Sequence, residues 1–127
     1  MLDHVGVDVS DIGKSRAFYE AALAPLGYRM IQDLTADQTG GNHIVMFGIE
    51  APEFVIAEDK APGPGNHFAF RAETRAAVNA FHAAALNAGG KDNGGPGLRP
   101  NYGPTYYAAF VYDPDGFNIE AVCHAPE

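Results

Sequence analysis

Two histidines and one glutamate occupy positions from which they could bind one metal ion. His4 and His67 each begin a segment in which apolar residues alternate with polar or small residues. If the alternating apolar side chains pack beneath a helix, both histidines face the opposite side of their strands. The same alternation in segment 117–123 places Glu120 on that side as well. Two imidazoles and one carboxylate could hold a divalent ion and leave positions open for substrate or water. The alternative is that all three are ordinary surface or hydrogen-bonded side chains.

An internal repeat relates the two histidines. A shift of 63 residues places His4 on His67 and gives seven identities in the 24 pairs from residue 4 to residue 27. The same shift, continued without a gap, places Ala57 opposite Glu120. The repeat predicts two copies of one structural module. Because alanine cannot bind a metal, we expect three protein ligands and not four.

Each module is expected to follow the order strand, helix and three strands. In the first module, strands are expected over 2–9, 28–34, 43–49 and 53–57, with a helix that is capped by Ser10 or Asp11 and ends near Pro25 and Gly27. In the second, strands are expected over 67–72, 105–112 and 117–123, with a helix that is capped by Thr74 and stopped by Gly89 and Gly90. Segment 91–104 is expected to be a glycine- and proline-rich loop with room for one short strand. The prediction is a single domain over 1–127, with modules at about 1–60 and 66–124 and a linker at 61–65.

Charge and cysteine content limit the partners and the setting. The 127 residues include 8 Lys and Arg against 16 Asp and Glu, so the net charge is −8. This balance disfavours nucleic acid and anionic membrane surfaces, and no apolar run is long enough to span a membrane. The single cysteine, Cys123, cannot form an internal disulfide, which favours a reducing cytoplasm. We therefore expect a small molecule or a metal ion as the partner.

Several other side chains could contact a substrate. Arg71 shares the face of the histidines and could form an ion pair there or bind an anionic substrate. Arg99 and Tyr102 lie in the glycine- and proline-rich segment, where binding residues are often displayed, although Arg99 could equally be free in solvent. Tyr106 and Tyr107 alternate on one strand, so one should face the ligand side and the other the helices.

The chain resembles the vicinal oxygen chelate superfamily, which groups glyoxalases, bleomycin resistance proteins and extradiol dioxygenases. The matching segments cover essentially the whole chain: Asp3-His4-Val5-Gly6-Val7, Phe18-Tyr19, Leu26-Gly27, His67-Phe68-Ala69-Phe70 and Asp113-Pro114-Asp115-Gly116-Phe117-Asn118-Ile119-Glu120. The resemblance implies an α+β fold in which paired βαβββ modules form a cup-shaped mixed sheet with helices on the outside. It also implies a homodimer and metal ligands at His4, His67 and Glu120. In some members the two modules of one chain close the cup and in others the partner chain completes it, and the sequence leaves both open.

The function that this resemblance implies is a metal-dependent, glyoxalase- or dioxygenase-like enzyme. It would be a lyase or a dioxygenase acting on a small oxygenated molecule chelated to Fe, Zn, Ni or Mn. Glu120 would be a ligand and a base, and Tyr106 or Tyr107 a hydrogen-bond donor, while the substrate-binding residues would be Arg71, Arg99 and Tyr102.

The missing fourth ligand and the lack of an evident base behind the expected ligands keep a second function open. Glyoxalase I enzymes carry a fourth ligand on the strand that here holds Ala57, and its absence argues against glyoxalase activity. The set of two histidines and one glutamate is most similar to the Fe(II) site of extradiol dioxygenases. The alternative function is a resistance-type protein that binds a drug or antibiotic without chemistry.

Overall fold

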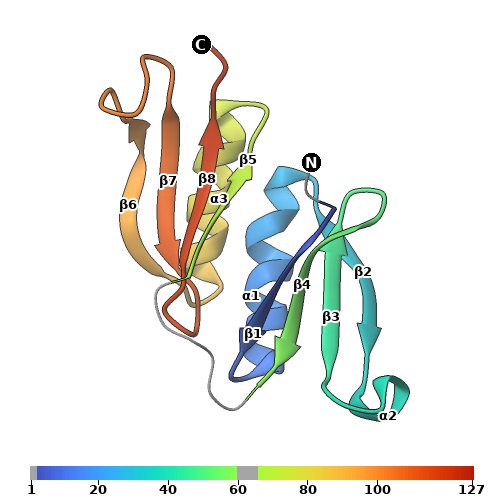
Figure 1. Ribbon diagram of the computed structural model, residues 1–127. Coiled ribbons are helices and arrows are strands. Elements are labelled where there is room, and N and C mark those ends of the chain that lie inside the picture. The colour runs from blue at the N-terminus through green and yellow to red at the C-terminus, as the bar shows by residue number, and fades with distance from the viewer. Residues whose placement is uncertain (1–2, 60–65) are drawn as a thin grey trace.

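The computed structural model describes residues 3–59 and 66–127, which form two copies of a βαβββ unit (Figure 1). The first unit contains β1 (Val5–Val9), α1 (Ile12–Leu23), the 3-10 turn η1 (Ala24–Leu26), β2 (Arg29–Leu34), the short helix α2 (Ala36–Thr39), β3 (Ile44–Gly48) and β4 (Pro52–Glu58). The second contains β5 (His67–Arg71), α3 (Arg75–Asn87), β6 (Lys91–Leu98), β7 (Tyr107–Tyr112) and β8 (Asn118–Cys123). The expected linker at 61–65 lies outside the described residues.

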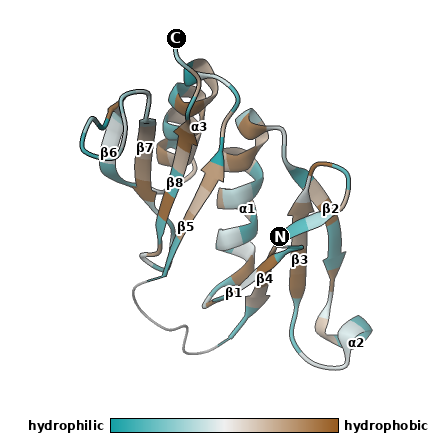
Figure 2. Ribbon diagram, turned by 45° about the horizontal axis from the view of Figure 1, so that its top comes forward, coloured by the Kyte–Doolittle hydropathy of each residue, from teal (hydrophilic) through white to brown (hydrophobic). Residues whose placement is uncertain are grey.

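Each unit forms one four-stranded mixed sheet, with strand orders β1-β4-β3-β2 and β5-β8-β7-β6. The first strand of each unit runs parallel to the last, and the other pairs are antiparallel. The expected α+β class and the repeated βαβββ order are confirmed. In Figure 2 the hydrophobic colour is concentrated on strands such as β3, β4 and β7, whereas β2 and the peripheral α2 are largely hydrophilic. None of the helices in the described ranges combines the length and the apolar character needed to cross a membrane.

The two long helices begin and end at the expected signals. Asp11 caps α1 by accepting a hydrogen bond from the Lys14 amide at 3.1 Å, and Thr74 caps α3 in the same way from Ala77 at 3.0 Å. After α1 the chain tightens into η1 and then reaches Gly27 at φ 90°, a conformation that glycine adopts without a steric penalty.

Segment 91–104 was expected to be a loop with room for one short strand, and residues 91–98 form the eight-residue strand β6. Its pairing with β7 contains two register shifts, at Asp92/Gly94 and at Gly94/Gly97. Such bulges allow a strand with glycine and proline in its interior to remain paired. The composition of the segment indicated a loop because glycine and proline are depleted in the interior of strands.

An aromatic cluster joins the two units. It consists of Tyr28 and Phe54 from the first unit and Phe68 and Phe70 from the second. Ring centroids lie 5.6 Å apart for Tyr28 and Phe70, 5.9 Å for Phe54 and Phe68, and 5.1 Å for Phe54 and Phe70. Edge-to-face contacts at such distances add to the free energy of burying the rings. We refer to these four residues as the interunit aromatic cluster.

The turn between β7 and β8 is also tied to the first unit. Tyr19 of α1 donates its hydroxyl to Asp113 Oδ2 at 2.6 Å, and the Ser10 amide donates to Asp115 at 3.1 Å. The other oxygen of Asp113 accepts from the amides of Asp115 at 2.9 Å and Phe117 at 2.8 Å. Burial raises the pKa of Asp113, and the hydrogen bond from Tyr19 opposes that shift. The turn therefore needs the first unit in place to satisfy its buried carboxylate.

We expect Tyr19→Phe to lower the free energy of unfolding by about 1–3 kcal/mol, because one buried oxygen of Asp113 loses its donor. Urea denaturation monitored by circular dichroism measures this change. Tyr112→Phe is the matched control: the Tyr112 side chain is 37% exposed, and its loss of a hydroxyl should change stability by less than about 0.5 kcal/mol. Equal losses in the two variants would contradict a stabilising role for the Tyr19 hydrogen bond.

Candidate functional site

The second unit brings His67, Glu120 and Tyr106 into contact. Nε2 of His67 lies 3.2 Å from Oε2 of Glu120, and the Tyr106 hydroxyl donates to the other carboxylate oxygen. The Glu120 side chain is only 4% exposed, so the alternative of a solvated glutamate at this position is wrong. A carboxylate buried without an ionic partner is costly, and its contacts here are a hydroxyl and an imidazole.

The hydrogen bond at Nδ1 of His67 determines which nitrogen of the ring carries the hydrogen. Nδ1 lies 2.9 Å from the backbone oxygen of Asn118, and a carbonyl can only accept, so Nδ1 carries the hydrogen. In the neutral ring Nε2 then offers a lone pair toward Glu120, which is itself an acceptor. Two acceptors at this distance need a proton or a cation between them. A carbonyl that holds the second nitrogen is also the usual support of a metal-binding histidine, so the donor set fits a divalent ion.

A cavity of about 630 Å³ opens beside this pair. Its lining residues are His67, Asn101, Tyr102, Tyr106, Phe110, Asn118 and Glu120. The rings of Tyr102 and Tyr106 make an edge contact with centroids 5.3 Å apart. Burial, and after it the nearby Glu120 carboxylate, raises the pKa of Tyr106 to about 12. Tyr106 therefore keeps its proton at neutral pH and acts as a hydrogen-bond donor.

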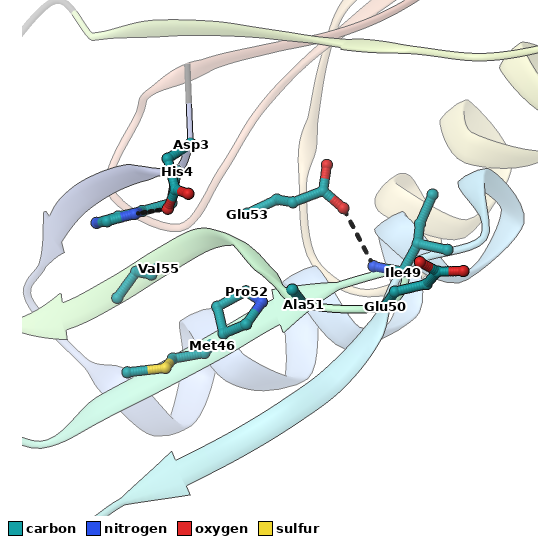
Figure 3. Close-up of a pocket in the computed structure, with 9 residues that line it drawn as sticks. All are labelled: Asp3, His4, Met46, Ile49, Glu50, Ala51, Pro52, Glu53 and Val55. Carbon is teal, nitrogen blue, oxygen red and sulfur yellow. Dashed lines mark hydrogen bonds and ion pairs between the residues drawn. The ribbon is translucent and has the colours of Figure 1, made fainter. Parts of the chain in front are cut away.

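His4 lies in a different cavity, on the first unit (Figure 3). This cavity of about 580 Å³ has a largely apolar wall that includes Met46, Ile49 and Val55. Nδ1 of His4 lies 2.6 Å from Asp3, which leaves Nε2 free of that contact, and the His4 side chain is 57% exposed. In Figure 3 the Glu53 carboxylate points away from His4 and accepts from the Ile49 amide at 3.3 Å.

Within residues 3–59 and 66–127, no three side chains of His, Cys, Asp or Glu converge as metal ligands. The chain thus brings together two of the three expected ligands, His67 and Glu120, and keeps His4 apart from them. A third cavity, of about 330 Å³, touches both histidines, but all four members of the interunit aromatic cluster lie in its wall. The rings of this cluster lie between the two units and contact one another there.

The remaining expected residues divide between the site and its surroundings. Tyr107 faces α3, where its hydroxyl donates to Asn79 at 2.7 Å, so Tyr106 is the tyrosine that contacts Glu120. Tyr102 lines the cavity of the second unit and is 64% exposed. Arg71 lies in the wall of the interunit cavity, and Arg99 lies over the Phe110 ring.

The strand pairing corrects the position expected for a fourth ligand. In the first unit Gly6 of β1 pairs with Val55, and in the second unit Ala69 of β5 pairs with Glu120. Because Gly6 and Ala69 are equivalent in the repeat, the counterpart of Glu120 is Val55, and the expectation of Ala57 is wrong. The second unit has two more residues before its last strand, and β3–β4 contains a register shift at Phe47/Gly48. An ungapped comparison of the halves cannot detect either.

Sequence reasoning gave no site role to Phe110, Asn118 or Glu53, although these residues line the two cavities. Phe110 and Asn118 line the second cavity because they lie beside Glu120 on the paired strands β7 and β8. Glu53, two residues before Val55 on β4, lines the first cavity. A gapped alignment of the halves, with the gap near the last turn, would have pointed to Val55 and Glu53.

Comparison with known proteins identifies the family. The profile described as "Glyoxalase/Bleomycin resistance protein/Dioxygenase superfamily" matches residues 1–121. The chain belongs to this superfamily. A search of curated proteins found no match.

Solved structures of other superfamily members share the fold. A glyoxalase/bleomycin resistance protein from Albidiferax ferrireducens is 30% identical, with 99% of each chain covered and a TM-score of 0.79. The fosfomycin resistance protein FosX from Listeria monocytogenes, solved as a mutant with Mn(II) and 1S,2S-dihydroxypropylphosphonic acid, is 18% identical over 98% of this chain and 90% of its own, with a TM-score of 0.71. A glyoxalase I mutant from Zea mays is 19% identical over 99% of this chain and 46% of its own, with a TM-score of 0.72.

In this superfamily member we expect Glu120→Gln to lower the pKa of Tyr106 from about 12. The value should stay above the ordinary tyrosine pKa of about 10, because burial is the larger cause of the shift and remains. The ¹³C shift of the Tyr106 Cζ, followed with pH in metal-free protein, measures the change. Glu53→Gln is the control, since it removes a carboxylate from the other cavity. An unchanged Tyr106 titration in Glu120→Gln would contradict the assigned contact.

Proposed function

We propose that the protein is a metal-dependent enzyme whose site is assembled from two copies of the chain. His67 and Glu120 of one subunit would hold a divalent ion together with His4 of the partner subunit. The observation that carries this proposal is the His67–Glu120 pair, in which a supported imidazole nitrogen and a buried carboxylate face each other at 3.2 Å. Fe, Zn, Ni and Mn all suit such a donor set.

The requirement for a second chain follows from where His4 lies. It is oriented as a metal ligand would be, with Nδ1 on a carboxylate and Nε2 free of that contact, but in its own cavity. The interunit aromatic cluster and the Tyr19–Asp113 hydrogen bond hold the units in an arrangement that keeps His4 apart from His67 and Glu120. We refer to His4 and its cavity, and to His67 and Glu120 with theirs, as the two half-sites. Two copies related by a twofold axis can place the first unit of each on the second unit of the other, which produces two equal sites. This arrangement predicts a homodimer.

The chemistry that a bound ion would supply is polarisation of two neighbouring oxygens of a small oxygenated substrate. Glu120 balances positive charge at the site and is placed to accept a proton from the substrate. Tyr106 offers a protonated hydroxyl that could donate to a substrate oxygen. These roles suit a lyase or a dioxygenase. The single cysteine supports a cytoplasmic setting for this enzyme.

Mixing two defective variants tests the shared site. We expect His4→Ala and His67→Ala each to bind Zn(II) or Mn(II) weakly as homodimers, since each removes a ligand from both sites. After subunit exchange, a heterodimer regains one intact site, with His4 from one variant and His67 from the other. About a quarter of all sites should then bind as in the wild type. Elemental analysis after dialysis measures the bound metal.

A mixture of Tyr112→Ala and His67→Ala is the control. The Tyr112→Ala chain keeps all three proposed ligands, so this mixture should bind metal without any need for complementation. No recovery of binding in the His4→Ala and His67→Ala mixture, although light scattering shows dimers that exchange, would rule out the shared site. Wild-type protein that binds no metal but still binds small aromatic molecules would favour the resistance-type alternative.

Restoring a carboxylate at the fourth position provides a second test. We expect Val55→Glu to tighten Zn(II) or Ni(II) binding by at least about tenfold, because Val55 is the counterpart of Glu120. Residues that only support the ligands already change metal affinity by about tenfold or more, and a carboxylate that binds the ion directly should have a larger effect. Ala57→Glu is a closely matched control, since it places the same charge two residues further along the same face of β4. Competition with a chelating dye measures both affinities. Equal tightening in the two variants would indicate a general charge effect and not ligation.

A further inference from the structure

Arg99 is fixed in one position by backbone and ring contacts. Its Nη1 donates to the Gly97 carbonyl at 2.9 Å and its Nη2 to the Gly95 carbonyl at 2.8 Å. The guanidinium carbon lies 5.3 Å from the centroid of the Phe110 ring. An arginine in solvent samples many rotamers, whereas these three contacts order both ends of the planar group.

The space that the guanidinium occupies exists because β6 is rich in glycine. A Cβ on Gly94 would lie 3.2 Å from Nη2, and a Cβ on Gly97 would lie 3.2 Å from Nη1. Gly94 has a φ of 147°, which residues with a side chain rarely adopt. The sequence feature that suggested a loop therefore forms a cradle for one arginine side chain.

The ordered guanidinium still has donors to offer. Arginine carries five N–H groups, and two carbonyl acceptors account for two of them. In the described part of the chain no carboxylate lies within ion-pair distance of Arg99, although the sequence holds twice as many acidic as basic residues. An anionic group could thus be bound by two parallel N–H donors.

Phe110 is the residue that both Arg99 and the proposed metal ligand His67 contact. The same phenyl ring that supports the guanidinium contacts the His67 ring, with centroids 6.5 Å apart. Phe110, Tyr102 and Tyr106 together supply aromatic surface to the cavity of about 630 Å³ that contains His67 and Glu120. A flat or apolar molecular body could lie on these rings while its ends reach both polar regions.

We propose that the substrate of this site is an organic anion, in which Arg99 binds a carboxylate, phosphonate or phosphate group while neighbouring oxygens at the other end face His67 and Glu120. Only the role given to the second end of the substrate rests on the proposed function, and the binding of an anion by Arg99 does not. Aromatic rings beside a carboxylate also suit an ammonium group. Here the guanidinium already occupies a face of Phe110, and its charge repels a second cation.

Binding of three probes of similar size tests the proposal: phenylphosphonate, the neutral benzyl alcohol and the cationic benzyltrimethylammonium. Calorimetric titrations use the dimeric protein, both loaded with Zn(II) and after EDTA treatment. We expect phenylphosphonate to bind best, and Arg99→Gln to weaken it by about ten- to hundredfold in both preparations. Arg99→Lys keeps the charge but loses the planar pair of donors, so it should recover only part of the affinity. Arg29→Gln, which removes an exposed arginine of β2, should leave binding unchanged.

The outcomes separate this inference from the proposed function. Protein that takes up no metal but binds phenylphosphonate through Arg99 would refute the metal site and support the anion site. Protein that binds metal normally, with equal phenylphosphonate affinity in wild type and a folded Arg99→Gln, would overturn the anion site alone. Preference for benzyltrimethylammonium over phenylphosphonate would also overturn it. If folded Arg99→Gln and Arg99→Lys both bound phenylphosphonate as tightly as the wild type, the anion site would likewise be overturned.

Discussion

The contact between the two units is the constraint on which the rest of the structure depends. Four aromatic rings bury one another across it, and the Tyr19 hydroxyl crosses it to reach the carboxylate of Asp113. The same arrangement of the units buries the rings and gives the buried carboxylate its donor. The relative position of the two sheets is therefore strongly determined. Each sheet then presents its own cavity, one with His4 and one with His67 and Glu120.

The two units share an architecture but present different chemistry. Val55 in the first corresponds to Glu120 in the second, and by the same pairing Met46 corresponds to Phe110. The first half-site therefore sets an exposed imidazole beside the apolar side chains of Met46 and Val55, with carboxylates such as Asp3 and Glu53 at its margin. The second combines a buried carboxylate with aromatic surface.

Local patterns in the sequence were sufficient to predict the βαβββ order, the helix caps and the side of the sheet that carries Glu120. Each of these depends on alternation or capping within a few residues. The strand register was beyond such reasoning, because a bulge and a longer turn shift the last strand by two residues and replace Ala57 with Val55 as the counterpart of Glu120. The choice between Tyr106 and Tyr107 was likewise decided by tertiary contacts. The separation of His4 from His67 could not be read from parity, which gives a face but not a distance.

The irregular β6 has a consequence for how copies of the chain can associate. It is the outer strand of the second sheet, and Pro96 together with two register shifts interrupts its hydrogen-bonding pattern. A strand of this kind is a poor template for an added strand, since proline offers no amide and each bulge displaces the next one. Growth of an aggregate by strand addition at this edge is thereby disfavoured.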